Sequence, residues 1–302
     1  MIQDARQLEL TIFGPIKKRL MKLGFIGVGN IAAALVEGFS TPGASRPGAV
    51  SVAAEPGDLD LFLSPRNEAR SKALAARYPR VTRLESNQAV LDRSEIVILS
   101  VRPPVATEVL GALKFRADHI VVSLVALLKY ADLATLASPA MAVSRAIPMP
   151  AAAKHNCPIA LYRPAPVVEQ LFARVGEPLV VDDEPQLHAL WTLTGLITPF
   201  YDLLGALSGW AIEHGVAPLT ANAYTAHLFQ SLAALAQLDP KAGFPAFAQH
   251  AATPGGLNEQ AGREIRKMAR TRPGSKPRIG CYQGLGERLP AHPGKVCVAS
   301  EP

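Results

Sequence analysis

The sequence predicts an α/β protein in which a doubly wound parallel sheet is followed by a second, all-helical domain. Over the first part of the 302-residue chain, short apolar runs alternate with helix-like stretches. This alternation stops near Glu184, and long segments with apolar residues at helical spacing follow. Strands that alternate with helices are typical of a parallel sheet covered by helices. The expected parts are an N-terminal extension (1–20), a dinucleotide-binding domain (21–183), a helical domain (184–270) and a basic Pro/Gly-rich tail (271–302).

The expected strands are short apolar runs bounded by polar or turn-forming residues. They are Leu23–Ile26, Leu59–Leu63, Ile96–Val101, Ile120–Leu124 and Met141–Ile147, with two more in CPIALY and EPLVVD. The helix-like stretches between them are Ile31–Phe39, Glu68–Tyr78, Val105–Leu113 and PVVEQLFARVG. In the helical domain, FYDLLGALSGWAIEHG and NAYTAHLFQSLAALAQL are apolar around much of their circumference. Such helices suggest burial against a second subunit as well as against their own core.

Composition favours a globular, cytoplasmic protein. Hydrophobic residues make up 49% of the chain without a run of membrane-spanning length, so we expect no membrane partner. The first residues place their basic cluster after the apolar stretch, which is the wrong order for a secretory signal. The three cysteines, Cys157, Cys281 and Cys297, lack metal-ligand spacing, and their odd number favours reduced thiols.

The net charge of +6 does not predict a nucleic-acid partner, because the basic excess lies at the ends of the chain. Residues 261–302 contain nine Lys or Arg and three Asp or Glu, whereas residues 21–260 contain 18 and 20. A basic tail rich in Pro and Gly is typical of solvated coil. No two of His188, His214 and His227 are four residues apart, so we expect no metal site.

The loop GFIGVGN predicts a dinucleotide site of the Rossmann type. Gly27, Gly29 and Ala32 form G-x-G-x-x-A directly after a strand and at the start of a helix. Gly27 suits a tight turn, Gly29 lets the backbone approach a pyrophosphate, and Ala32 allows close packing of helix on strand. The phosphates would lie at the helix N-terminus, with Asn30 and Ile31, where unpaired N–H groups favour negative charge. The alternative is a purely structural tight turn.

The end of the second strand, Ser64-Pro65-Arg66-Asn67, indicates which dinucleotide binds. NAD-binding proteins usually place an acidic residue there to hold the ribose 2′-hydroxyl, whereas a 2′-phosphate needs hydroxyl or cationic partners. Ser64, Arg66 and Asn67 therefore favour NADPH over NADH. The alternative is that Arg66 is a solvated residue on a loop that caps the following helix.

Four segments carry a family resemblance: MKLGFIGVGNIAAALVEGF, ILSVRPPVATEVL, SRAIPMPAA and ATPGGLNEQ. Their order and spacing over residues 21–268 resemble those of the pyrroline-5-carboxylate reductases, NADPH-dependent enzymes that make proline. The resemblance implies that the nicotinamide end of the cofactor lies against Ser100, Val101, Arg102 and Pro103. It also implies a small cyclic imino acid as substrate and a homodimer formed through the helical domain.

In the same family, a Pro-Gly-Gly turn opens a helix whose N-terminal amides hold the carboxylate of the substrate. The resemblance assigns this role to Pro254, Gly255 and Gly256, which are followed by Leu257 and Asn258. The family usually has two threonines at these last positions, so Leu257 and Asn258 predict a less polar pocket. Further departures from the family pattern are Leu127, Met149 and the segment TGLITPFY. They suggest a substrate with more apolar surface than pyrroline-5-carboxylate.

The predicted reaction is hydride transfer from NADPH to a C=N bond, for which the protein orients the two reactants. Thr253 is the candidate catalytic hydroxyl, although an N-cap role is equally compatible with its position. Asn258 could bind substrate or stabilise the first helical turn. Two other functions stay open: a non-catalytic NADPH-binding protein of this fold, and a β-hydroxyacid dehydrogenase-like enzyme. The latter needs a lysine from the helical domain as acid and base, and residues 184–239 contain none.

Overall fold

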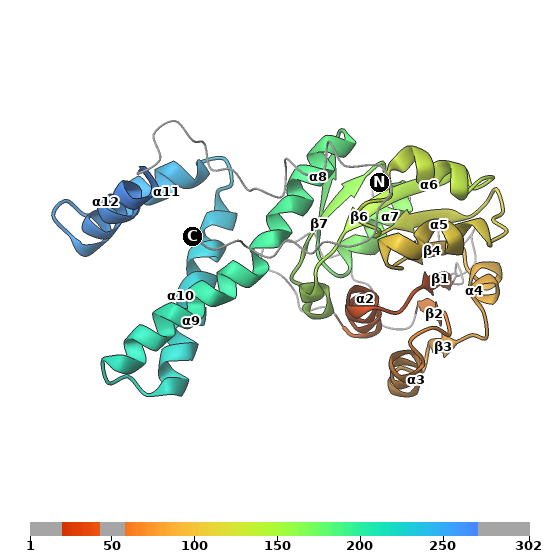
Figure 1. Cartoon of the computed structure of the whole chain (residues 1–302), viewed down its shortest axis with the longest axis horizontal. Coiled ribbons are helices and arrows are strands. Elements are labelled where there is room, and N and C mark those ends of the chain that lie inside the picture. The colour runs from red at the N-terminus through yellow and green to blue at the C-terminus, as the bar shows by residue number, and fades with distance from the viewer. Residues whose placement is uncertain (1–19, 43–57, 271–302) are drawn as a thin grey trace, which may run out of the picture. The chain divides into compact units, whose positions relative to one another are not determined.

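The computed structural model describes residues 20–42 and 58–270 of the chain (Figure 1). The chain divides into two compact units, of which the first ends at Trp191 and the second begins at Thr192. The boundary therefore lies within the first helix of the segment predicted as the helical domain. The predicted tail (271–302) and, apart from Leu20, the predicted extension (1–20) lie outside the described residues.

The first unit is built on an eight-stranded sheet with the order β3-β2-β1-β4-β5-β6-β7-β8. Its strands are β1 (Met21–Ile26), β2 (Leu59–Leu63), β3 (Val81–Arg83), β4 (Ile96–Leu99), β5 (Ile120–Ser123), β6 (Ala142–Ile147), β7 (Pro158–Tyr162) and β8 (Glu177–Val181). Neighbouring strands are parallel except for β6 and β7. The connection between these two contains the short 3₁₀ helix η1 (Pro150–Lys154) and no α-helical crossover, which suits antiparallel neighbours.

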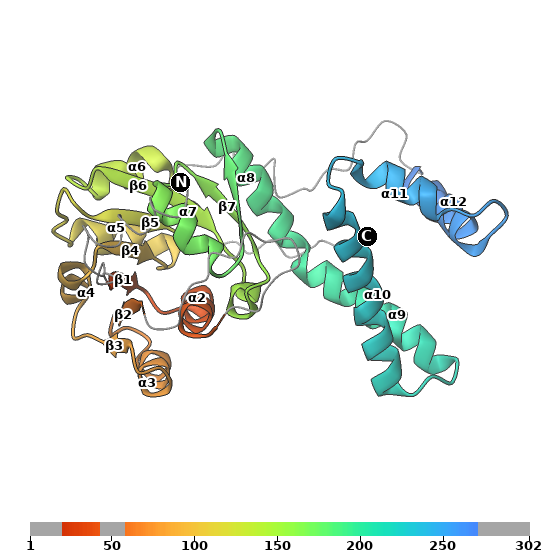
Figure 2. The same cartoon turned by 180° about the vertical axis from the view of Figure 1, so that it is seen from behind.

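Helices cover both faces of this sheet (Figures 1 and 2). They are α2 (Asn30–Ser40), α3 (Glu68–Arg77), α4 (Asn87–Arg93), α5 (Pro103–Gly111), α6 (Tyr130–Leu136) and α7 (Pro166–Ala173). Two hydrophobic clusters result: one contains Leu35 of α2 and Phe172 of α7, and the other contains Leu91 of α4 and Leu110 of α5. The predicted doubly wound α/β fold is therefore confirmed.

Three elements of the first unit, β3, α4 and α6, are absent from the sequence-based prediction. They are only three, seven and seven residues long, so none carries enough apolar residues to show a period. The strand β3 pairs with β2 at the carboxyl end of both strands, so its last residue lies next to the last residue of β2.

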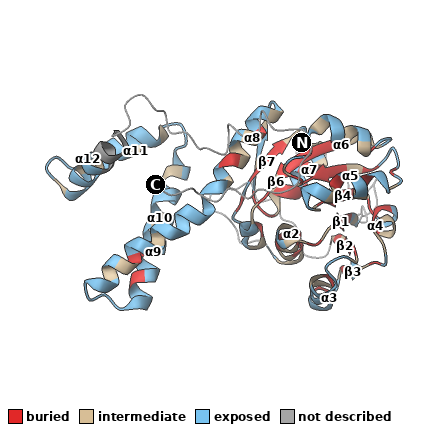
Figure 3. Cartoon of the chain, in the orientation of Figure 1, coloured by how far each residue is buried: buried red, intermediate tan, exposed pale blue. Residues whose placement is uncertain are grey.

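The second unit is helical, as predicted, but it buries little of its own apolar surface. After α8 (Glu184–Leu193), which crosses the boundary, come η2 (Thr194–Leu196), α9 (Ile197–Glu213), α10 (Pro218–Leu238), α11 (Gly243–Ala251) and α12 (Leu257–Arg270). Helices α9 and α10 contact each other, and the rings of Phe200 and Phe229 lie 5.9 Å apart. Among residues 192–264, only Thr192, Ser208, Ala221 and Thr225 are buried, and most of this unit is exposed in Figure 3.

One helical stretch, Glu184–Glu213, is long and apolar enough to cross a membrane by length and composition alone. Its most apolar window has a mean hydropathy of 1.2, and 6% of that window is buried. It is the only such stretch among the described residues, and a single one is weak evidence for a membrane span.

Candidate functional site

Two of the predicted cofactor loops, the glycine turn at Gly27 and the loop that begins at Ser100, meet where the strand order reverses, between β1 and β4. In doubly wound sheets this is the place where ligands bind, at the carboxyl ends of the strands. Gly27, which follows β1, has φ +93°, and a Cβ atom there would lie 2.5 Å from the Ser100 carbonyl oxygen. The Ser100 N–H in turn donates to the Ile26 carbonyl at 2.8 Å. Glycine at position 27 therefore allows the two loops to pack against each other.

The predicted loop after β2, residues 64–67, is hydrogen-bonded to the glycine turn after β1. The Ser64 side chain is fully buried, and its Oγ accepts a 2.9 Å hydrogen bond from the Gly27 N–H. Asn67 has φ +63°, which asparagine tolerates better than most residues, and its Nδ2 donates to the Val28 carbonyl at 2.9 Å. Ser64 and Asn67 thus fix the shape of the glycine turn from the neighbouring strand.

The start of α2 fits a pyrophosphate. Gly29 is the N-cap, no side chain caps this helix, and a Cβ atom at Gly29 would meet nothing within 4 Å. Asn30 is exposed and Ile31 is half-buried at the first two helical positions, whose N–H groups have no intrahelical acceptor. Ala32 is fully buried, which agrees with the predicted close packing of helix on strand. The open space and unpaired donors are the features that bind phosphate at a helix N-terminus.

The remaining predicted cofactor residues lie on the same edge of the sheet. Ser100 and Val101 are half-buried after β4, whereas Arg102 is the exposed N-cap of α5 and Pro103 is its first residue. Arg66 is exposed on the loop after β2 and forms no hydrogen bond or ion pair with the described residues. The structure therefore brings the three loops together and leaves the Arg66 guanidinium available to a ligand.

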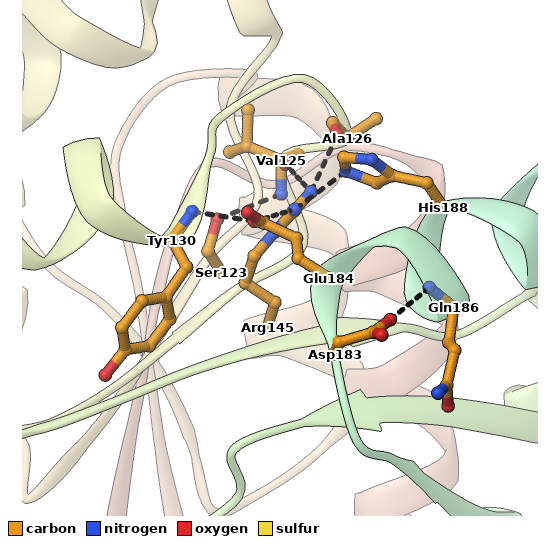
Figure 4. A network of polar contacts seen from close by, with 9 residues as sticks. All are labelled: Ser123, Val125, Ala126, Tyr130, Arg145, Asp183, Glu184, Gln186 and His188. Atoms are coloured by element: carbon orange, nitrogen blue, oxygen red, sulfur yellow. Dashed lines mark hydrogen bonds and ion pairs between the residues drawn. The ribbon is translucent and has the colours of Figure 1, made fainter. Parts of the chain in front are cut away.

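A buried polar network, which the sequence analysis missed, lies at the carboxyl end of β5 (Figure 4). Arg145 of β6 is 2% exposed; its Nη1 lies 2.5 Å from a Glu184 carboxylate oxygen and 2.9 Å from Nε2 of His188. Its Nη2 donates to the carbonyls of Val125 and Ala126 at 3.3 and 2.7 Å. The network ties the loop after β5 to the first turns of α8, within the first unit.

Glu184 also accepts a 2.7 Å hydrogen bond from the Tyr130 N–H at the start of α6. Burial lowers the pKa of His188, and the adjacent Arg145 guanidinium lowers it further. His188 is therefore held neutral, which lets Nε2 accept from Arg145. The only signal in the sequence was an arginine inside the apolar run AVSRAI, since a buried arginine requires partners.

The Pro-Gly-Gly turn of the second unit has the backbone conformation that its glycines predict. Gly255 has φ +73°, and the Gly256 N–H donates to the Thr253 carbonyl at 2.9 Å. Thr253 and Pro254 are exposed, and Leu257 is 80% exposed at the first position of α12.

The turn also binds a carboxylate of the chain itself. The Gly255 N–H donates to Oε2 of Glu259 at 2.8 Å, and Glu259 pairs with Arg263 at 3.1 Å. Nδ2 of Asn258 donates to the Ala251 carbonyl at 3.1 Å. In this structure Asn258 therefore links α12 to the end of α11, and the Gly255 amide faces an anionic oxygen.

Within the described residues, no group of three or more His, Cys, Asp or Glu side chains could hold a metal ion. Cys157 is buried and forms no disulfide with another described residue, while Cys281 and Cys297 lie outside the described residues.

Fold and site together define a dinucleotide-binding protein of the Rossmann class. Residues 22–127 match the family model described as NADP oxidoreductase, coenzyme F420-dependent. The chain is 29% identical over 192 residues to a pyrroline-5-carboxylate reductase of Pseudomonas aeruginosa. This match covers 61% of the chain and 66% of the relative, slightly less than two thirds of its length.

Solved structures show the same fold. The 1-pyrroline-5-carboxylate reductase of Streptococcus pyogenes aligns with a TM-score of 0.65 and 20% identity over 88% of this chain and 96% of that one. The enzyme from Coxiella burnetii gives 0.66 and 19% over 83% and 92%. The Plasmodium falciparum enzyme, with NADP bound, gives 0.64 and 15% over 82% and 90%. The resemblance to pyrroline-5-carboxylate reductases is therefore confirmed in sequence, and the fold agrees.

Proposed function

We propose that this protein is an NADPH-dependent reductase of the C=N bond in a small cyclic imino acid. The observation that carries the proposal is the joined set of three loops at the β1 and β4 ends. Gly27 is hydrogen-bonded to Ser64 and packs closely against Ser100 there, beside an uncapped helix N-terminus. The likeness to pyrroline-5-carboxylate reductases supports the reaction class.

The end of β2 supports NADPH rather than NADH. Ser64, Arg66 and Asn67 follow the strand, and no carboxylate replaces them to repel a 2′-phosphate. Arg66 is exposed and unpaired among the described residues, so it can form a charge-assisted hydrogen bond without breaking another. Such a bond typically contributes about 1.5–3 kcal/mol.

The Pro-Gly-Gly turn supports a substrate that bears a carboxylate. Its Gly255 amide already binds a carboxylate oxygen, that of Glu259, at 2.8 Å. A substrate carboxylate would take the place of Glu259, and Thr253, Pro254, Gly256, Leu257 and Asn258 would complete the binding turn.

NADPH held by the loops at Gly27, Ser64 and Ser100 would supply the hydride for reduction of the C=N bond. The nitrogen gains its proton from solvent or from the Thr253 hydroxyl. The protein orients the two reactants, which needs no metal and no catalytic triad.

The helical unit supports a homodimer or a larger homo-oligomer. Trp210, Leu228, Leu232 and Leu235 are between 43 and 61% exposed, which is costly for large apolar side chains in water. A second copy of the chain that covers these helices would explain their apolar character without a membrane. We propose that this assembly is soluble and lies in the cytoplasm, where the buried thiol of Cys157 would stay reduced.

Steady-state oxidation of NADPH tests the proposed reaction. Pyrroline-5-carboxylate, pyrroline-2-carboxylate, piperideine-2-carboxylate and an uncharged pyrroline should be compared under the same conditions. We expect turnover of at least one carboxylated imine, and roughly hundredfold lower kcat/KM for the uncharged one, because the turn would lose a charged partner. Equal turnover with and without the carboxylate would contradict the role of the turn. No turnover of any imine would favour a non-catalytic NADPH-binding protein.

A further inference from the structure

Arg83 lies at the carboxyl end of β3, next to the loop that carries Arg66. It is the last residue of β3 and pairs in register with Leu63, the last residue of β2. Because the two strands are parallel, both end at the edge of the sheet where the cofactor loops meet. Arg83 is half-buried.

The Arg83 guanidinium contacts the loop after β2 that carries Arg66. Its Nη2 donates to the carbonyl of Pro65, the residue before Arg66, at 3.4 Å, and its Nε donates to Oγ of Ser71 at 3.1 Å. Ser71 is itself fully buried, and its N–H donates to the carbonyl of Asn67 at 3.0 Å. Nη1 of Arg83 forms no hydrogen bond with any described residue.

The charges around this loop favour an anion. Residues 64–72, SPRNEARSK, contain three basic side chains, Arg66, Arg70 and Lys72, against one acidic side chain, Glu68. Glu68 is paired with Lys72 at 2.7 Å, and the pKa of Glu68 is lowered chiefly by Lys72 and further by Arg83. The one carboxylate of this segment therefore already has a cationic partner, and the segment together with Arg83 carries an excess of positive charge.

We propose that Arg83 is a second cationic determinant of NADPH specificity, which acts with Arg66 on the phosphate of the ribose 2′ position. Arg66 approaches the phosphate from the exposed loop, and Arg83 approaches from the adjacent strand while it holds the Pro65 carbonyl. This inference rests on the proposed NADPH dependence. It adds a residue that the sequence analysis did not include, on a strand that the sequence analysis did not predict.

The test is a titration of NADPH and of NADH into the full-length chain, followed by nicotinamide fluorescence. Arg83→Met removes the charge and keeps an apolar stem of similar length. We expect it to weaken NADPH binding by roughly ten- to hundredfold, as one charged hydrogen bond would, and to change NADH binding by less than about twofold. Arg83→Lys, which keeps the charge but not the planar fork, should restore part of the NADPH affinity.

Arg80 supplies a matched control. It is half-exposed and lies just before the same strand, but its Nε and Nη2 bind the Leu59 carbonyl and Asp60 at the amino end of β2. Arg80→Met should therefore leave the affinity for both nucleotides unchanged.

Two results would overturn the inference: equal weakening of NADPH and NADH, which would mean that Arg83 only braces the loop, or unchanged NADPH affinity. A failure of the proposed function looks different, because the unaltered chain would then show no preference for NADPH over NADH. Retained NADH binding by Arg83→Met shows that the variant is folded.

Discussion

The two units of the chain differ in how far they bury their large apolar side chains. In the sheet unit, Leu23, Leu63 and Ile98 are completely buried within one chain. In the helical unit, Trp210 and Leu232 are 61% and 55% exposed. Apolar area removed from water stabilises a fold by about 25 cal/mol per Å². The helical unit in a single chain therefore gains much less of this stabilisation than the sheet unit does. The sheet unit buries its large apolar side chains within one copy of the chain, whereas the helical unit leaves many of them exposed.

The same contrast separates the two glycine-rich turns. The turn at Gly27 is held from both neighbouring strands, by Ser64 and by the close approach of Ser100. The turn at Gly255 is held mainly by residues next to it in sequence, Thr253 and Glu259. The turn proposed for the cofactor is therefore fixed by long-range contacts, and the turn proposed for the substrate by local ones.

The largest expected effect is on the stability of the sheet unit. Glu184→Ala removes the carboxylate from Arg145, whose side chain is 3% exposed, and also frees the Tyr130 N–H. A buried charge without its partner is costly, so we expect a loss of about 3 kcal/mol in the free energy of unfolding, measured by chemical denaturation. Lys154→Ala is the control, because Lys154 is 78% exposed in its pair with Glu37 and should cost less than about 1 kcal/mol. Equal losses in the two variants would contradict a buried role for the network.

A second expected effect is on assembly of the helical unit. Leu228, Leu232 and Leu235 form an exposed stripe on one face of α10. If a second copy covers this stripe, Leu232→Glu buries an unpaired charge and should weaken self-association by about 2 kcal/mol. Light scattering at micromolar concentration measures this, with Gln230→Glu on the opposite side of the helix as control. A stable monomer of the unaltered chain would contradict the proposal that a second copy covers this stripe.

The smallest expected effect is a dependence of stability on pH. The pKa of His188 is lowered by burial and by Arg145, and the pKa of His119 is lowered by burial and by Arg116. Below about pH 6.5 the unfolded chain binds more protons at these histidines than the folded chain does, so the free energy of unfolding should fall as the pH drops. Each histidine contributes at most about 1.4 kcal/mol per pH unit. His188→Gln should make the profile between pH 7 and pH 5 less steep, and an unchanged profile would count against its burial as a neutral ring.

The sequence predicts the sheet better than it predicts the contacts that shape the site. Long apolar runs such as Leu59–Leu63 show their period, and G-x-G-x-x-A shows where the first loop lies, because both are local patterns. The hydrogen bond from Gly27 to Ser64 and the pair of Arg145 with Glu184 join residues far apart in the chain. No local pattern can reveal such pairs.

Arg83 was missed for a related reason. Its strand is too short to be recognised from its residues, so its place beside β2 becomes visible only when the pairing of β3 is known. The Pro-Gly-Gly turn was predicted from family resemblance, but the hydrogen bond from the Gly255 N–H to the Glu259 carboxylate was not.

The central claim is that the sheet unit alone holds NADPH and that the helical unit holds the substrate. One titration of NADPH into the unaltered chain, Gly27→Val and Gly256→Val tests this claim most directly. Valine at position 27 would adopt an unfavourable φ near +93° and collide with the Ser100 carbonyl, so we expect NADPH binding to weaken by at least about a hundredfold. Valine at position 256 would disturb only the Pro-Gly-Gly turn, so its NADPH affinity should equal that of the unaltered chain. Tight NADPH binding by Gly27→Val, or a comparable loss in Gly256→Val, would contradict the proposal that the sheet unit alone holds NADPH.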